Sequence, residues 1–340
     1  MYDCIPARRL PASKTRPFGA MLRAAVLLCA ATIVAPAPAS AADYPSNPVH
    51  LIVPFAPGGA VDGIGRLTAQ ALAKELGQQV VVENKPGAGG VIGITAAAHA
   101  APDGYTVLMG NIALASAPAL YDKLTFNPAK DFAGIATIGK GPYVLVVPAK
   151  FPAHTLKQLI QLAKEHPGKY NFASAGTGSA IHLAGELFKS MAQINIVHVP
   201  FKGAGPAATA LLGGQVQMMF GSLMEMMPLI QSGKVRALGV SSLQRTKYAP
   251  KIPTIAESGL PGFEVTGWYG LFVPAATPPA IVAKLSSAAN RALKASFLQE
   301  QLPHYKLDPV GGTPAQTDKF LGSEIAKWTK VVHDAHIKAN

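Results

Sequence analysis

Apolar runs alternate with glycine-rich turns and amphipathic segments in a regular order along the first third of the chain. Short apolar runs predict buried strands, and apolar residues spaced by three and four predict helices. The predicted strands are residues 49–54, 79–83 and 103–110, and the predicted helices are residues 62–77 and 91–100. The resulting β-α-β-α-β order predicts a parallel, doubly wound sheet, which binds ligands at the carboxyl ends of its strands.

The same pattern starts again near residue 142 and predicts a second α/β unit. Its predicted strands are residues 142–149, 170–174, 194–201 and 235–242, and its predicted helices are residues 155–166 and 180–192. Between them, residues 205–220 predict a helix, a Gly-Gly stop and a short strand. The tail from Thr277 onward is predicted to be helical and to cover the first unit.

Two similar segments bracket this second unit, LVVPA at residues 145–149 and LFVPA at residues 271–275. Two strands that leave the first unit and re-enter it would form a double hinge, although V-P-A is also a common strand ending. The hinge interpretation predicts a first domain of residues 43–142 plus 268–340 and a second domain of residues 143–267.

The first 42 residues have the order of a secretory signal peptide. Five basic residues precede or begin an apolar stretch at 24–34, and small residues follow as far as Ala42. This order predicts export and cleavage after Ala41 or Ala42, with Met1 or Met21 as the start. Both cysteines, Cys4 and Cys29, fall in this leader, so the mature chain would have no thiol.

The chain carries a formal net charge of +12, and removing the leader's five basic residues and one acid leaves +8. A positive surface suits acidic small molecules and nucleic acids alike. The basic residues are scattered and no aromatic stripe interleaves them, which argues against a nucleic-acid partner.

The segment NFASAGTGSAIH, which begins at Asn171, places a small polar turn in front of a predicted helix. The first N–H groups of a helix lack partners within it and attract anions. The hydroxyls of Ser174, Thr177 and Ser179 add donors, and Gly178 lets a ligand approach the backbone. Alternatively, Ser179 or Thr177 only caps the helix.

Similar small residues follow four other predicted strands. They predict a ligand cleft that includes Phe55, Gly58 and Gly59, Asn111, Phe201, Gly203 and Gly205, and Ser222. Asp62 is predicted as a helix N-cap and as a ligand-binding residue of this cleft. Phe55 either packs beneath the turn or faces the ligand. The first turn lacks the Lys-Ser/Thr of a P-loop and a G-x-G-x-x-G fingerprint, which argues against nucleotides.

No catalytic constellation emerges from the remaining polar residues. Ser174 is not in a G-x-S-x-G elbow. His198 is predicted to be structural, and His182 to be structural or to face the cleft. The chain has no H-x-x-x-H pattern, which argues against a metal site. We therefore expect no catalytic residue, no metal and no cofactor.

Eight segments together resemble the tripartite tricarboxylate transporter receptors, the Bug-type periplasmic solute-binding proteins. They include YPSNPVHLIVPFAPGGAVD, VVVENKPGAGGVIG, FASAGTGSAIHLAGELFK and VPFKGAGPAATALLGGQVQMMF, in order along nearly the whole mature chain. The resemblance implies an α/β fold of the type II periplasmic-binding-protein class: two doubly wound domains, two hinge strands and a ligand cleft between the domains.

The same resemblance implies a function and partners. The protein would be a periplasmic, monomeric receptor that binds a small organic carboxylate through backbone N–H groups and hydroxyls and docks transiently to a two-component membrane permease. A ligand-sensing subunit for a two-component signalling system is an alternative, as is a secreted hydrolase.

Overall fold

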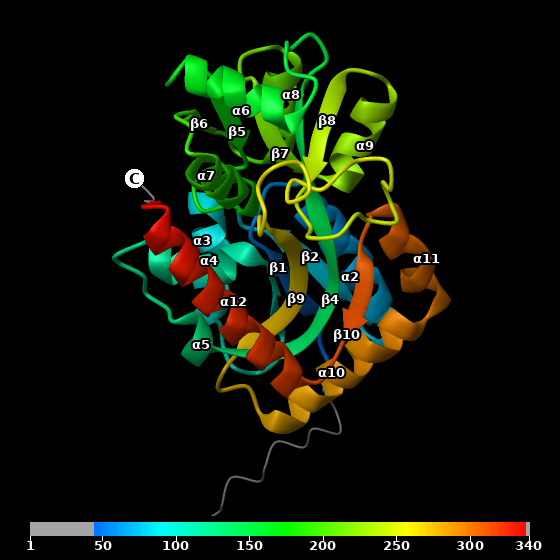
Figure 1. Cartoon of the computed structure of the whole chain (residues 1–340). Coiled ribbons are helices and arrows are strands. Elements are labelled where there is room, and N and C mark those ends of the chain that lie inside the picture. The colour runs from blue at the N-terminus through cyan, green and yellow to red at the C-terminus, as the bar shows by residue number, and fades with distance from the viewer. Residues whose placement is uncertain (1–43, 338–340) are drawn as a thin grey trace, which may run out of the picture. The chain divides into compact units, whose positions relative to one another are not determined.

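The computed structural model describes residues 44–337 (Figure 1). The predicted signal peptide, residues 1–42, lies outside the described residues. Within the described range, no helix is long and apolar enough to cross a membrane. Ten strands join into one continuous sheet, in which the long strand β4 (Phe132–Pro148) connects a first set of strands to a second.

The first set begins with three parallel strands, in which the first strand lies between the other two. The elements are β1 (Val49–Val53), α2 (Ala60–Leu76), β2 (Val80–Asn84), the 3-10 turn η1 (Ala88–Gly90), α3 (Val91–Ala98) and β3 (Thr106–Gly110). Gly77 ends α2 in the left-handed conformation, with φ 67°, which glycine adopts without strain. The predicted β-α-β-α-β order is confirmed.

After β3 the structure departs from the prediction. Residues 112–120, for which no element was predicted, form helix α4 (Ile112–Leu120), which Asn111 caps. A single turn, α5 (Pro128–Asp131), then leads into β4. β4 begins ten residues before the predicted strand at residue 142, and its first part pairs antiparallel with β9 (Thr266–Pro274).

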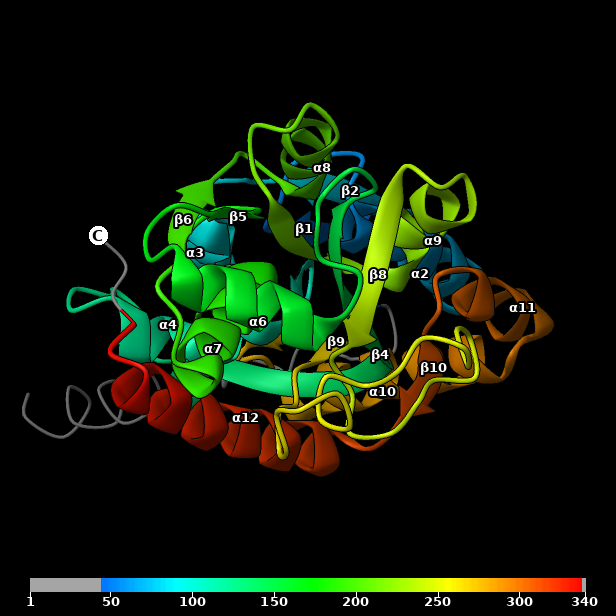
Figure 2. The ribbon, with the colours of Figure 1, turned by 45° about the horizontal axis from the view of Figure 1, so that its top comes forward.

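The second set of strands forms around the far end of β4. Its elements are α6 (Leu156–Glu165), β5 (Asn171–Ser174), α7 (Ala180–Ala192), β6 (Val197–Pro200), α8 (Ala204–Leu212), β7 (Met218–Ser222), α9 (Leu223–Gln231) and β8 (Val235–Val240). β5 is parallel to β6 and β7, whereas β7 and β8 pair antiparallel with β4. Figure 2 shows β8 beside β4. The second α/β unit is therefore confirmed.

We call the part built on β1, β2, β3, β9 and β10 (Asp308–Gly311) the first lobe, and the part built on β5 to β8 the second lobe. The chain crosses between them at Pro142–Tyr143 and at Val265–Thr266. Ser241 ties both crossings, because its hydroxyl accepts from the Tyr143 N–H at 2.8 Å and donates to the Val265 carbonyl.

The two similar segments do not themselves form the crossings. LVVPA lies within the second lobe, where β4 pairs with β7 and β8, and LFVPA ends β9 at the far side of the first lobe. The residues that the structure describes form one compact unit by contact, so the hinge and the domain boundaries at 142 and 268 stay predictions.

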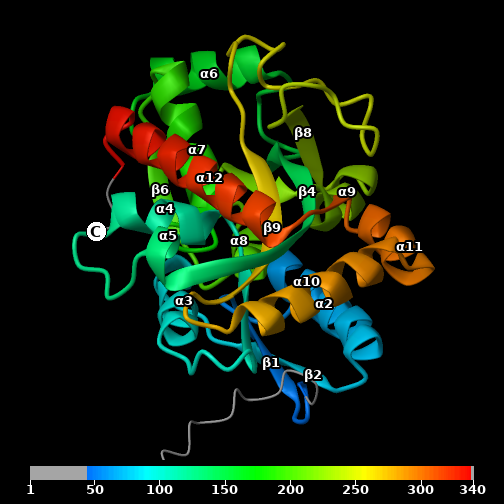
Figure 3. The ribbon, with the colours of Figure 1, turned by 90° about the horizontal axis from the view of Figure 1, so that it is seen from below.

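The C-terminal segment is mainly helical, as predicted, apart from β10. It comprises α10 (Pro279–Lys294), α11 (Ser296–His304) and α12 (Pro314–Asp334). α10 packs on α2 and β4, while α12 packs on α4 and β4 (Figure 3). Trp268 of β9 and Trp328 of α12 both donate to Glu324 and are almost completely buried, which fixes α12 on the sheet.

Candidate functional site

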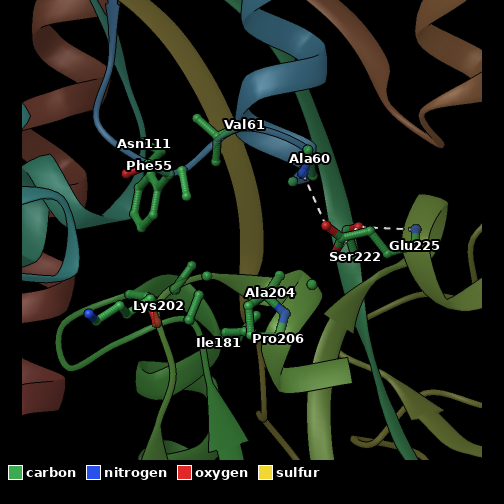
Figure 4. A pocket seen from close by; sticks show the side chains of 18 of the residues that line it. Phe55, Ala60, Val61, Asn111, Ile181, Lys202, Ala204, Pro206, Ser222 and Glu225 are labelled. Carbon is green, nitrogen blue, oxygen red and sulfur yellow. Dashed lines mark hydrogen bonds between the residues drawn. The ribbon is translucent and has the colours of Figure 1, made fainter. Parts of the chain in front are cut away.

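A cavity of about 270 Å³ lies between the two lobes (Figure 4). The first lobe contributes residues 55–61 and Asn111, and the second lobe contributes Ala175, residues 179–181, residues 202–206, Ser222 and Glu225. Tyr143 and Tyr269, from the two strands β4 and β9, complete the lining. An adjoining cavity of about 500 Å³ shares Phe55 and Lys202 with the first and extends along residues 86–90.

The β1–α2 turn forms the first lobe's wall of the cavity. Gly59, not Asp62, is the N-cap of α2, so the predicted cap was wrong. Asp62 lies three residues into the helix and accepts from the Gly58 N–H at 3.0 Å and from Asn84 at 2.9 Å. Asp62 therefore holds the turn from behind and does not line the cavity.

The charge of Asp62 is stabilised inside the fold. Burial would raise the pKa of this carboxyl, but hydrogen bonds from Arg66, Gly58 and Asn84 outweigh burial and hold the pKa below its ordinary value of 3.8. Asp62 is thus ionised at neutral pH and keeps Gly58 and Gly59 in place at the cavity. Gly58 has a φ of 88°, which favours glycine at this position.

Phe55 and Asn111 also line the cavity from the first lobe. Phe55 follows β1 and faces both cavities. Asn111 caps α4, since its Oδ1 accepts from the Ala113 N–H at 3.0 Å. The side-chain NH2 group of Asn111 is therefore the part available for a ligand.

Two residues of the turn before α7, Ser179 and Thr177, lie in different surroundings. Ser179 caps α7, with its hydroxyl accepting from the His182 N–H at 3.4 Å, and it also lines the cavity with Ala180 and Ile181. Thr177 instead faces the first lobe. Its carbonyl accepts from the Tyr121 hydroxyl at 3.2 Å, and that hydroxyl also lies 3.0 Å from the Ala88 carbonyl.

Ser174, Gly178 and His182 lie behind the cavity. Ser174 is fully buried, with its Oγ 2.6 Å from His198 Nε2, and it accepts from the Gly176 N–H at 3.1 Å. The Gly178 N–H donates to His182 Nδ1 at 3.1 Å. His182 is 2% exposed and lies outside both cavity linings, which favours a structural role. These residues shape the turn from within the second lobe.

Four predicted residues come from later strand ends of the second lobe. Gly203 and Gly205 follow β6, and Gly203 has a φ of 123° that brings the backbone to the cavity. Ser222 ends β7 and caps α9. Phe201 lines only the adjoining cavity.

Four polar lining residues were not predicted from the sequence: Tyr143, Lys202, Glu225 and Tyr269. Lys202 stands inside the predicted turn PFKGAG and could have been found there. Glu225 carries a weaker signal, the S-x-x-E spacing from Ser222 that marks a helix start. The tyrosines lie in apolar strands, where nothing distinguishes a residue facing the cavity from one in the core.

Glu225 reaches across the cavity from α9. Its Oε1 accepts from the Ala60 N–H of the first lobe at 3.0 Å, and its Oε2 accepts from the Ser222 hydroxyl at 2.9 Å (Figure 4). Burial raises the pKa of Glu225 above its ordinary value of 4.5, against the lowering effect of these hydrogen bonds. Burial likewise raises the pKa of Tyr143 and of Tyr269, and the charge of Glu225 adds to both shifts.

The groups that line the site are suited to binding a ligand. Lys202 and the N-termini of α2, α7, α8 and α9 supply positive potential, and Asn111, Ser179 and Ser222 supply neutral polar groups. Within residues 44–337, no three His, Cys, Asp or Glu side chains come together as a metal site.

A family model described as the tripartite tricarboxylate transporter family receptor matches residues 64–337. The chain belongs to this family. Members of the family are periplasmic binding proteins, a non-enzymatic class. The predicted family and the predicted periplasmic-binding-protein fold are thus confirmed.

Three solved structures are similar to this receptor over most of its length. The periplasmic binding protein BugD is 35% identical, with a TM-score of 0.83 over 87% of this chain and 100% of that chain. MatC from Rhodopseudomonas palustris, with bound malate, is 37% identical, with a TM-score of 0.81 over 85% and 100%. Rpa4515 from R. palustris, with adipate, is 33% identical, with a TM-score of 0.83 over 87% and 99%.

In this receptor, most of the predicted site residues come together at the cleft. Those that line the main cavity are Phe55, Gly58, Gly59, Asn111, Ser179, Gly203, Gly205 and Ser222. Phe201 lines the adjoining cavity, while Asp62, Ser174, Thr177, Gly178 and His182 lie outside both linings. The part of all these residues in ligand binding stays a prediction.

Proposed function

We propose that this receptor captures a small carboxylated solute in the cleft between its lobes and delivers it to a tripartite tricarboxylate-type membrane transporter, without catalysing a reaction. The observation that carries the proposal is the N-terminus of α7 at the cavity. The first amides of a helix have no partner within it, and here they belong to Ala180 and Ile181, which line the cavity beside Ser179.

A carboxylate at this position would meet backbone N–H groups, the Ser179 hydroxyl and the positive end of the α7 dipole. Lys202, on the same lobe, adds a full positive charge to the lining. The bound malate of MatC and the adipate of Rpa4515 support carboxylates as the solute class, since both proteins share the fold and a third of the sequence.

Two observations support binding in place of catalysis. The 2.6 Å contact between Ser174 Oγ and His198 Nε2 resembles a nucleophile with its base, but Ser174 is fully buried and lies outside the cavity lining. A nucleophile has to reach its substrate. The pair therefore fits a structural role, in which it holds the turn before α7.

Closure of the lobes would complete the site. We infer that the second domain, residues 143–267, rotates against the rest of the chain about the two crossings next to Ser241. Small-angle scattering should give a smaller radius of gyration with a saturating solute than without it. An unchanged radius would argue against the hinge.

We expect the mature receptor to be periplasmic after removal of residues 1–42 and to act as a monomer. The test begins with a thermal-shift screen of purified mature protein against mono- and dicarboxylates, followed by calorimetric titration of the hits. Uptake of the best solute should fall when either the receptor gene or the genes of the two membrane components are deleted. Turnover of a carboxylic ester, or stabilisation by no carboxylate, would contradict the proposal.

A further inference from the structure

The side chain of Glu225, the third residue of α9, does not close the capping box that its position would allow. Ser222 and Glu225 have the spacing of a capping box, in which the glutamate returns to the backbone N–H of the capping serine. The structure contains two closed boxes of this type, at α6 with Thr155 and Gln158 and at α12 with Thr313. At α9 the serine half is formed, but the Glu225 carboxylate turns to the cavity instead.

The contacts of this carboxylate come from both sides of the cleft. Oε1 accepts from the Ala60 N–H of the first lobe, and Oε2 accepts from the Ser222 hydroxyl of the second lobe. Both donors are neutral. Among residues 44–337, no Lys, Arg or His forms an ion pair with Glu225 within 4.0 Å. A carboxylate has roughly four acceptor positions, so this one retains capacity for a donor from a ligand.

The cleft therefore has two electrically different sides. Lys202 and the first amides of α7 attract an anion, and Figure 4 shows Lys202 on the opposite side of the pocket from Glu225. Apart from Glu225 and Lys202, the titratable groups that line the cavity are the Tyr143 and Tyr269 hydroxyls. Tyrosine hydroxyls are neutral at physiological pH, and burial raises the pKa of these two further. A second anionic group of the solute would meet like charge at this end.

We propose that Glu225 selects a solute that carries a protonated amine in addition to its carboxylate. The carboxylate would bind at the N-terminus of α7, and the ammonium group would donate to the Glu225 carboxylate. This inference rests on the proposed function and specifies the solute class within it. It separates this receptor from the malate-bound and adipate-bound relatives, whose ligands carry two carboxylates.

The ionisation of Glu225 fits this pairing. Burial raises the pKa of the Glu225 carboxyl in the solute-free protein. An adjacent ammonium would lower that pKa again, because an opposite charge favours the ionised form. Binding of an amino acid should therefore release a proton at pH values where the carboxyl of the solute-free protein is still partly protonated, and titrations in two buffers of different ionisation enthalpy would detect that release.

The test uses matched ligands that differ only at one end. Calorimetric titration of the mature receptor would compare 4-aminobutanoate with succinate and butanoate, and 6-aminohexanoate with adipate and hexanoate; shorter amino acids would cover closer spacings. We expect the amino acid of the best-fitting length to bind at least about tenfold more tightly than its dicarboxylate partner. Glu225→Gln should reduce this preference by about tenfold or more, while the affinity for the monocarboxylate changes by less than about twofold.

Glu300→Gln is the matched control, because it removes the same charge from an exposed position on α11. It should keep the ligand order of the unmodified receptor. If dicarboxylates bind best to the unmodified receptor, or if Glu225→Gln weakens all ligands equally, the selection is overturned but carboxylate binding stands. If no carboxylate of the series binds, the proposed function fails and the selection fails with it. The ligand order of the unmodified receptor decides the matter even if Glu225→Gln does not fold.

Discussion

The imidazole rings of His182 and His198 lie against each other beneath the turn before α7, with centroids 4.1 Å apart and planes tilted by 37°. Burial, followed by the charges of His198 and Lys189, lowers the pKa of His182 to about 3. Burial and Lys189 lower the pKa of His198 to about 4. Glu186 lies 3.8 Å from His182 Nε2, but Lys189 also contacts that carboxylate at 3.3 Å. Both rings are therefore neutral in the folded protein at pH 7.

The first prediction follows from these two pKa values. The unfolded chain binds more protons than the folded one between about pH 3 and the ordinary histidine value of 6.5, so stability rises with pH in this window. On acidification from pH 6.5 to 4, the free energy of unfolding should fall by an amount on the order of a few kcal/mol. Urea denaturation at several pH values measures this slope.

His182→Gln should flatten the slope, because glutamine can accept from the Gly178 N–H without taking up a proton. His154→Gln, at an exposed position, serves as the control and should retain the slope of the unmodified protein. Equal slopes for His182→Gln and the unmodified protein would contradict the assignment.

The second prediction separates the two hydroxyls of the α7 turn. Ser179→Ala should lower stability by about 1 kcal/mol through loss of the cap and weaken carboxylate binding by about ten- to hundredfold, because a hydrogen bond to a charged group contributes about 1.5–3 kcal/mol. Thr177→Ala is the matched control, since Thr177 lies outside the cavity lining, and its affinity should change by less than about twofold. Calorimetric titration beside melting temperatures distinguishes them, and an intact affinity in Ser179→Ala would leave the hydroxyl only a capping role.

The third prediction concerns a contact that joins the lobes away from the solute. The Tyr121 hydroxyl of the first lobe lies within 3.2 Å of the Thr177 carbonyl of the second lobe. Tyr121→Phe should favour the open form and weaken solute binding by about two- to tenfold, the effect of losing about 0.5–1.5 kcal/mol. Scattering should also show a larger radius of gyration at subsaturating solute. Tyr305→Phe, on the first lobe and outside the cleft lining, is the control. Equal solute affinities in the two variants would show that the Tyr121 contact does not stabilise the closed form.

The sequence specified the parts of this fold that have regular periodicity. The strands β1, β2 and β3 and the helices between them follow from apolar runs and glycine turns. The long β4 did not follow, because Gly134, Gly139 and Gly141 interrupt its apolar pattern. Those glycines have a packing role: a Cβ at Gly134 would lie 2.7 Å from Thr317, and one at Gly141 would lie 2.6 Å from the Lys306 carbonyl.

The candidate site was predictable where strand ends carry small polar residues, and not where tertiary packing decides orientation. Ser179 and Thr177 are two residues apart and look alike in sequence, yet only Ser179 lines the cavity. Glu225 was missed because its role depends on Ala60, which is 165 residues away. Local spacing predicts only the bond between Ser222 and Glu225 on the same helix.

The last prediction concerns the stability cost of keeping Glu225 in the cleft. Because burial raises the pKa of this carboxyl above 4.5, the folded protein binds more protons than the unfolded one between pH 4.5 and the raised value. Glu225 therefore lowers stability as pH rises through that window, and the loss is complete above it. Glu225→Gln has no such loss and can still accept from the Ala60 N–H. Without solute, its melting temperature should match that of the unmodified protein near pH 4 and exceed it at pH 7 to 8. Glu300→Gln, which changes a side chain exposed to water, should show little of this pH-dependent gain in melting temperature. If the melting temperature of Glu225→Gln instead falls below that of the unmodified protein at pH 8, the charged Glu225 carboxylate stabilises the fold and the prediction is wrong.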